Sequence, residues 1–145
     1  MSLGYGLGLG RVFNVVHNAS GVNINLTHYG AVTFVSFEDD GSTILTLTEC
    51  QDAADTGEQA LAIIDKVHKG PGVGGTWTEV TQTAAGTYDL ADDTTNDAVC
   101  LTVEAGELSD GFTHVQCTVD GGVVTAILHD PKVRRKPANM PSPIA

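Results

Sequence analysis

The side chains that could carry chemistry are scattered along this chain of 145 residues. The five histidines form no HxH or HExxH pattern and no cluster with cysteine; they are His17, His28, His68, His114 and His129. A strand histidine beside an aspartate, as in His129-Asp130, is typical of a hydrogen-bonded structural pair rather than a metal ligand. We therefore expect no metal site at the histidines.

The carboxylates give no better case for catalysis. Asp89, Asp92, Asp93 and Asp97 lack the Asp-x-Asp-x-Asp-Gly order of a calcium loop, so an ordinary solvated loop is the expectation. Paired acids such as those at 39 and 40 would point to opposite faces of an extended chain. No Gly-x-Ser-x-Gly elbow is present. We expect no catalytic residue, no cofactor and no enzyme activity.

The three cysteines indicate a reducing compartment. Cys50, Cys100 and Cys117 lie in apolar or Thr-rich runs without CxxC spacing, which predicts buried free thiols. The first residues lack the basic region of a signal peptide. An odd cysteine count without an export signal fits assembly in a reducing cytoplasm.

The elements that must position these side chains are predicted to be strands. Alternating, β-branched segments separated by turn residues predict strands at residues 11–17, 22–28, 31–37, 43–49, 76–81, 98–104, 112–119 and 123–128. About eight short strands predict one all-β domain, an antiparallel β-sandwich or barrel, over residues 11–130.

Two connections and one segment need separate predictions. Asp120-Gly121-Gly122 predicts a tight hairpin between the last two strands. Residues 57–69 fit either a short helix or a buried strand, and a helical turn or a bulged strand is slightly favoured. Residues 70–75 and 85–97 are expected to be loops.

The N-terminal ten residues form a first arm. Leu3, Tyr5, Leu7 and Leu9 alternate with glycine, which places apolar side chains on one face of an extended chain and none on the other. A bare face allows another backbone to approach closely. We expect residues 1–10 to dock on a partner as an added strand or arm.

The C-terminal residues 131–145 form a second arm, with four of the chain's five prolines. It carries Lys132, Arg134, Arg135 and Lys136, followed by Pro137, whereas residues 12–131 hold two basic residues against eighteen acidic ones. Proline fixes φ and removes donors, so the arm should be extended. We expect its basic residues to dock on an acidic surface, including that of a neighbouring copy.

The charge excludes some partners. A net charge of −11 argues against nucleic acid or an anionic membrane as the partner of the domain, because both require clustered basic residues. No apolar run is long enough to span a bilayer as a helix.

Several segments resemble minor virion proteins of tailed bacteriophages, in particular the small head-associated proteins of phages that infect actinobacteria. The resemblance lies in Leu108-Ser-Asp-Gly-Phe-Thr-His-Val-Gln-Cys117, in residues 126–140 with the basic Pro-containing tail, and in Thr46-Leu-Thr-Glu-Cys-Gln, Ala60-Leu-Ala-Ile-Ile64 and Gly75-Thr-Trp77. It covers roughly residues 43–140. It implies a decoration or cement protein on the capsid exterior that binds the phage major capsid protein.

Closed symmetric association is the rule for such proteins, so a homo-oligomer is expected, with a trimer as the guess by analogy with threefold positions of icosahedral shells. Two alternatives stay open. One is a tail or head-tail connector subunit. The other is a β-sandwich module that binds a glycan or small ligand through Trp77, Tyr88 and the loop from Asp89 to Asp97.

Overall fold

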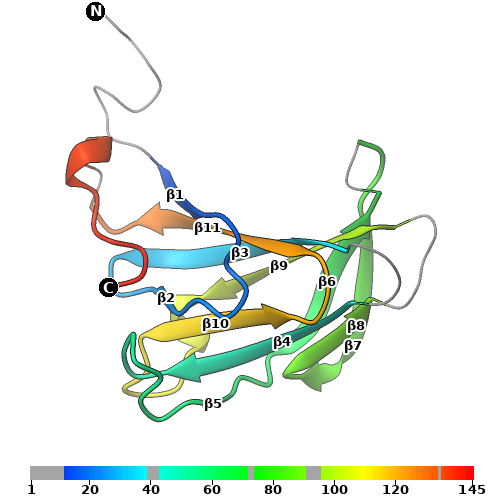
Figure 1. The fold of residues 1–145 in the computed structure, drawn as a ribbon, viewed down its shortest axis with the longest axis horizontal. Coiled ribbons are helices and arrows are strands. Elements are labelled where there is room, and N and C mark those ends of the chain that lie inside the picture. The colour runs from blue at the N-terminus through cyan, green and yellow to red at the C-terminus, as the bar shows by residue number, and fades with distance from the viewer. Residues whose placement is uncertain (1–11, 39–42, 72–73, 91–95, 134) are drawn as a thin grey trace, which may run out of the picture.

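The chain folds into two antiparallel sheets that pack face to face (Figure 1). The computed structural model describes residues 12–38, 43–71, 74–90, 96–133 and 135–145. The strands are β1 (Phe13–Val16), β2 (Ile24–Asn25), β3 (Tyr29–Phe37), β4 (Thr43–Cys50), β5 (Gln59–Ala60), β6 (Ile64–Gly70), β7 (Thr78–Ala85), β8 (Thr87–Leu90), β9 (Ala98–Glu104), β10 (His114–Val119) and β11 (Val123–Pro131). Two 3-10 turns, η1 (Ala105–Glu107) and η2 (Pro137–Asn139), complete the described elements.

The larger sheet has the order β1-β11-β3-β9-β6-β7, and the smaller has the order β2-β10-β4-β5 with β8 also paired to β4. Within the described residues no strand pairing joins the two sheets into a closed cylinder. The predicted all-β class is confirmed, and the architecture is the sandwich rather than the barrel. The described part of the chain holds no helix long and apolar enough to cross a membrane.

The core lies between the sheets and follows the two-residue period of the strands. Val32 and Phe34 of β3 point inward and are fully buried, while Thr33 and Val35, which alternate with them, are only partly covered. Leu45 and Leu47 of β4 meet them from the smaller sheet. Each such aliphatic or aromatic side chain contributes about 1.5–3 kcal/mol when removed from water. This shared core fixes which face of every strand remains outside.

One predicted connection is wrong. The turn at residues 120–122 forms, but β10 belongs to the smaller sheet and β11 to the larger, so the turn is an arch between sheets and not a hairpin. The connection from β3 to β4 likewise passes from one sheet to the other. A Gly-rich turn motif predicts that the chain reverses its direction. It does not predict which sheet each of the two strands joins.

Two of the predicted segments are also corrected. Residues 57–69 include β5 and all of β6 except Gly70, with a register irregularity between Ile64 and Lys66, so the bulged strand is confirmed and the helical turn is wrong. Residues 85–97 are not one long loop, because β7 extends to Ala85 and β8 follows at Thr87–Leu90. β5 and β8 have only two and four residues, which is too short for a local pattern to identify a strand.

Candidate interaction surfaces

The two terminal segments meet at one end of the larger sheet. β1 is an edge strand paired with β11, and its first residue, Phe13, lies opposite His129. β11 ends at Pro131, directly after that pair, and the Lys132 amide then donates to the His28 carbonyl at 3.0 Å. The chain therefore enters and leaves the sandwich side by side (Figure 1).

The last residues fold back onto their own domain. The Asn25 amide donates to the Pro143 carbonyl at 2.8 Å, and the Asn25 side-chain amide donates to the Ala145 carbonyl at 2.6 Å. Because Asn25 belongs to β2, the edge strand of the smaller sheet, this segment covers an otherwise open edge. Met140 packs against the core beside it. The arm predicted at residues 131–145 is thus tied down, and the contacts described here are to its own chain.

The basic residues of this arm remain at the surface. Lys132, Arg135 and Lys136 are exposed, and no ion pair of the described residues involves them. The backbone of Pro137 begins η2. The other proposed contact residues lie outside the described residues: Leu3, Tyr5, Leu7, Leu9 and Arg134. Docking of either arm on a partner therefore stays a prediction.

The outer face of the larger sheet is unusually apolar near β1, β3 and β11. Val15 of β1 and Val123 of β11 are 43% and 48% exposed, and Phe13 and Phe37 are similarly accessible. Ile127 lies between them, opposite Val15, and is only partly covered. These residues all belong to the outward phase of their strands and share one face of the sheet with Thr33 and Thr125. The sequence shows which residues alternate within each strand. It does not show that apolar side chains from neighbouring strands share the outer face of the sheet.

A cleft of about 410 Å³ opens in the larger sheet between β6 and β9. The two strands pair only where His68, Lys69 and Gly70 face Cys100, Val99 and Ala98. Beyond that point β6 and β9 are separated by a gap. The irregularity between Ile64 and Lys66 accounts for this separation, because a bulge bends its strand.

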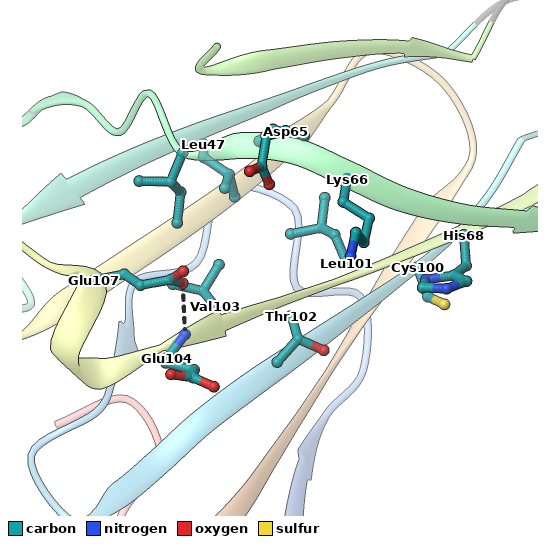
Figure 2. Close-up of a pocket in the computed structure, with 12 residues that line it drawn as sticks. Leu47, Asp65, Lys66, His68, Cys100, Leu101, Thr102, Val103, Glu104 and Glu107 are labelled. Carbon is teal, nitrogen blue, oxygen red and sulfur yellow. Dashed lines mark hydrogen bonds between the residues drawn. The ribbon is translucent and has the colours of Figure 1, made fainter. Parts of the chain in front are cut away.

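The cleft has an apolar floor and a charged rim (Figure 2). Leu47, Leu101 and Val103 form the floor. In Figure 2, Asp65 and Lys66 lie on the β6 side and Glu104 and Glu107 on the β9 side. The Glu107 carboxylate accepts the Glu104 amide at 3.0 Å, which closes the rim at this end. Sequence reasoning missed this cleft, because it depends on where two strands stop pairing.

The sequence candidates for metal and ligand binding are placed apart. His129 Nδ1 lies 2.9 Å from Asp130 Oδ2 and its Nε2 lies 2.9 Å from Thr33 Oγ1, which confirms the hydrogen-bonded pair. Across the described ranges, no three His, Cys, Asp or Glu side chains gather as a metal site would require. Asp92 and Asp93 lie outside those ranges.

The three thiols are free, as predicted, but they differ in burial. Cys50 and Cys117 are buried, and burial raises the pKa of the Cys117 thiol to about 12. Cys100 is only partly buried, because it faces outward at the narrow end of the cleft. The prediction of a buried thiol is therefore corrected at this one position.

The aromatic pair proposed for glycan binding does not share a surface. Trp77 is 44% exposed and lies against Gly70 on the outer face of the larger sheet, whereas Tyr88 is 7% exposed and belongs to the core. A sugar platform built from both side chains is therefore excluded by the fold. Trp77 remains a lone surface aromatic.

These features define the protein as an antiparallel β-sandwich with terminal segments that converge at one end. No protein-family model and no curated protein matches the sequence. The fold is similar to the crystal structure of SPBc2 prophage-derived protein YomS, with a TM-score of 0.31 and 12% sequence identity over 80% of this chain and 91% of that chain. A similarity at this level carries no conclusion about the function of this chain.

Proposed function

We propose that this protein is a structural component of a tailed-phage virion that decorates the outside of the head and stabilises it through its terminal segments. The observation that best supports this role is the convergence of both terminal segments at one end of the sandwich, where Phe13 pairs with His129 just before β11 ends. A single contact region can then engage both arms. The resemblance of residues 43–140 to head-associated proteins points to the same role.

The surface at this end has the chemistry of a docking region. Lys132, Arg135 and Lys136 supply positive charge on an acidic protein, and the neighbouring Val15 supplies exposed apolar area. Interfaces combine such an apolar area with charges that select the partner and raise the association rate. The partner of the basic residues is therefore an acidic surface, which we propose belongs to the phage major capsid protein.

The proposed setting is the exterior of a capsid assembled in the host cytoplasm, with the protein present as a symmetric homo-oligomer, a trimer in the simplest case. Light scattering of the purified chain measures its solution mass. A larger closed ring would favour the tail or connector alternative instead.

The test is co-sedimentation of the full chain with heads assembled from the major capsid protein of the same phage. We expect the variant Lys132→Gln/Arg135→Gln/Lys136→Gln to bind between about threefold and a hundredfold more weakly, because three interfacial charge pairs each contribute about 0.2–1 kcal/mol. The control Thr83→Glu/Thr87→Glu/Thr118→Glu changes the net charge equally at exposed positions elsewhere, and it should bind like the unchanged chain.

Other results would contradict the proposal in identifiable ways. Equal binding by both triple variants would remove the basic residues from the interface. Binding to isolated tails or connectors but not to heads would favour the alternative virion role. Glycan binding that is abolished by Trp77→Ala, with no head binding by any form, would favour the ligand-binding module.

A further inference from the structure

The cleft between β6 and β9 separates two strands over part of their length. β9 is paired with β3 and β6 with β7, so each has a partner on its outer side. The stretches Ile64–Val67 and Leu101–Glu104 face the cleft without pairing with one another. Two strand edges that face a common gap can receive an added chain by backbone hydrogen bonds, as in β-augmentation.

The lining of the cleft restricts what can bind. Its floor residues are nearly inaccessible to water, with Leu101 at 6% and Val103 at 0% exposure. A volume of about 410 Å³ is within the range of roughly 300–1,000 Å³ typical of ligand sites. A cleft with an apolar floor between two strands suits apolar side chains that project from one face of an extended backbone.

One segment of this protein has that pattern. Leu3, Tyr5, Leu7 and Leu9 fall on one face of an extended chain, and glycines occupy the other. Seven residues in extended form span about 23 Å, whereas Leu101–Glu104 spans about 13 Å, so about four of residues 3–9 can lie along the cleft at one time. Glycine at every second position lets flanking backbones approach closely.

The charges are also complementary. The β9 side of the rim carries Glu104 and Glu107, and Asp65 faces them from β6. Against these three carboxylates the rim has the ammonium of Lys66 and the imidazole of His68. Arg11 follows the Leu-Gly alternation directly. If residues 3–9 bind in the cleft, the guanidinium of Arg11 is therefore brought close to an acidic rim.

We propose that the cleft between β6 and β9 binds residues 3–9 of a second copy of this chain. The position of β1 favours a second copy over the same chain. Phe13, His129, Ala31 and Glu104 lie in one row at the end of the sheet, so β11 and β3 separate the start of β1 from the cleft. β1 begins at this end of the sheet, and a second copy can present residues 3–9 to the cleft without crossing β11 and β3.

This inference rests on the proposed role of the terminal segments in assembly, but it is tested without heads. The acceptor chain carries Thr102→Cys with Cys100→Ser and a size tag. Each donor carries Cys100→Ser with one of Gly4→Cys, Tyr5→Cys, Gly6→Cys, Leu7→Cys, Gly8→Cys or Leu9→Cys. Cys50 and Cys117 are buried and remain in both chains. Donor and acceptor are mixed, oxidised with diamide and separated without reduction.

We expect tagged donor–acceptor disulfides whose yield alternates along the arm, higher at the glycine positions. The reason is that Thr102 faces outward, since its hydroxyl lies 2.8 Å from that of the outward-facing Thr33, while the Leu face would enter the cleft. In the control acceptor, Thr118→Cys with Cys100→Ser, the exposed thiol lies on the smaller sheet and should give low, even yields.

A flat profile equal to that of the Thr118→Cys control would overturn the proposal. So would a disulfide that forms only within one chain when Thr102→Cys and an arm cysteine are combined in the same molecule. Adding Leu7→Ser/Leu9→Ser to a reactive donor should lower its yield at least threefold. Head binding by the full chain can persist in any of these cases, so this proposal and the proposed function fail separately.

Discussion

At the scale of single residues, the buried Glu49 is the clearest case of a charge built into the fold. It lies at the end of β4 in the inward phase and is 1% exposed. Its carboxylate accepts the Ser109 amide at 2.8 Å, the Ser109 hydroxyl, and the Gln59 side-chain amide at 2.6 Å. A buried carboxylate is tolerated only when it is hydrogen-bonded in this way. Glu49 thus joins β4, β5 and the loop after η1.

These contacts predict how stability depends on pH. Burial raises the pKa of Glu49, but the hydrogen bonds from Ser109 and Gln59 outweigh burial and hold the pKa below its ordinary value of 4.5. A lowered folded pKa contributes stability above about pH 4.5 that is lost as the pH falls through the folded pKa. His114 adds a second acid-labile contribution that begins near pH 6.5, because burial lowers its pKa, partly opposed by Asp52.

Glu49→Gln should therefore lower the free energy of unfolding by about 2 kcal/mol at pH 7, because the amide would place donors against the donors of Ser109 and Gln59. The difference from the unchanged chain should shrink as the pH falls from 4.5 to 3. Urea unfolding at several pH values measures this. Glu58→Gln removes an exposed carboxylate and should stay within about 0.5 kcal/mol. A constant difference at all pH values would contradict the assignment.

The sequence contained part of this information. Thr43, Leu45 and Leu47 establish the inward phase of β4, and Glu49 continues it, so a charged residue in an apolar phase was visible. Its partners were not, because Ser109 is separated from it by sixty positions and joins it only through the packing of the two sheets. His129-Asp130 was predictable for the opposite reason, since its partner is the next residue.

At the scale of elements, the arch between β10 and β11 is held by an unusually close backbone approach. Gly122 has φ of +77°, and a Cβ at this position would lie 1.9 Å from the Phe37 carbonyl oxygen at the end of β3. Only glycine can occupy such a position without displacement of the strand. The arch therefore packs closely against the end of β3, where the connection from β3 to β4 begins.

Gly122→Ala should cost about 3 kcal/mol, because it adds a clash with backbone to the cost of a positive φ. Gly111 provides a matched control, since its φ is +83° but a Cβ added there would meet only open space within 4 Å. Gly111→Ala should cost about 1 kcal/mol from backbone conformation alone. Thermal and urea unfolding of the two variants separate these contributions, and equal losses would show that the close approach is unimportant.

The same region explains why the elements were easier to predict than their pairing. The segments at 31–37 and 43–49 were close to β3 and β4 because their alternation is local. Their assignment to different sheets depends on which inward faces meet across the core. The short strands β5 and β8 exist through pairing with β4. β8 alternates polar and apolar residues, but two and four residues are too few for a local pattern to identify either strand.

At the scale of the whole molecule, Tyr29 connects the two ends of the chain. It is fully buried at the start of β3, between the edge strand β1 and the C-terminal segment. Its hydroxyl accepts a hydrogen bond from the Asn14 side-chain amide at 3.1 Å and donates to the Pro141 carbonyl at 3.1 Å. If the terminal segments form one docking region, this hydroxyl couples their positions.

Tyr29→Phe should loosen both ends together, with a loss of about 1 kcal/mol in overall stability because two partly buried polar groups lose their shared partner. Hydrogen exchange should become faster in residues 12–16 and in 139–145. Asn25→Ala provides the contrast, since it removes only the side-chain contact to Ala145 and the local bond to the Thr27 amide. That variant should expose the C-terminal segment while β1 stays protected. Faster exchange at only one end in Tyr29→Phe would mean that the two segments are held independently, and the converging ends would then dock as separate arms.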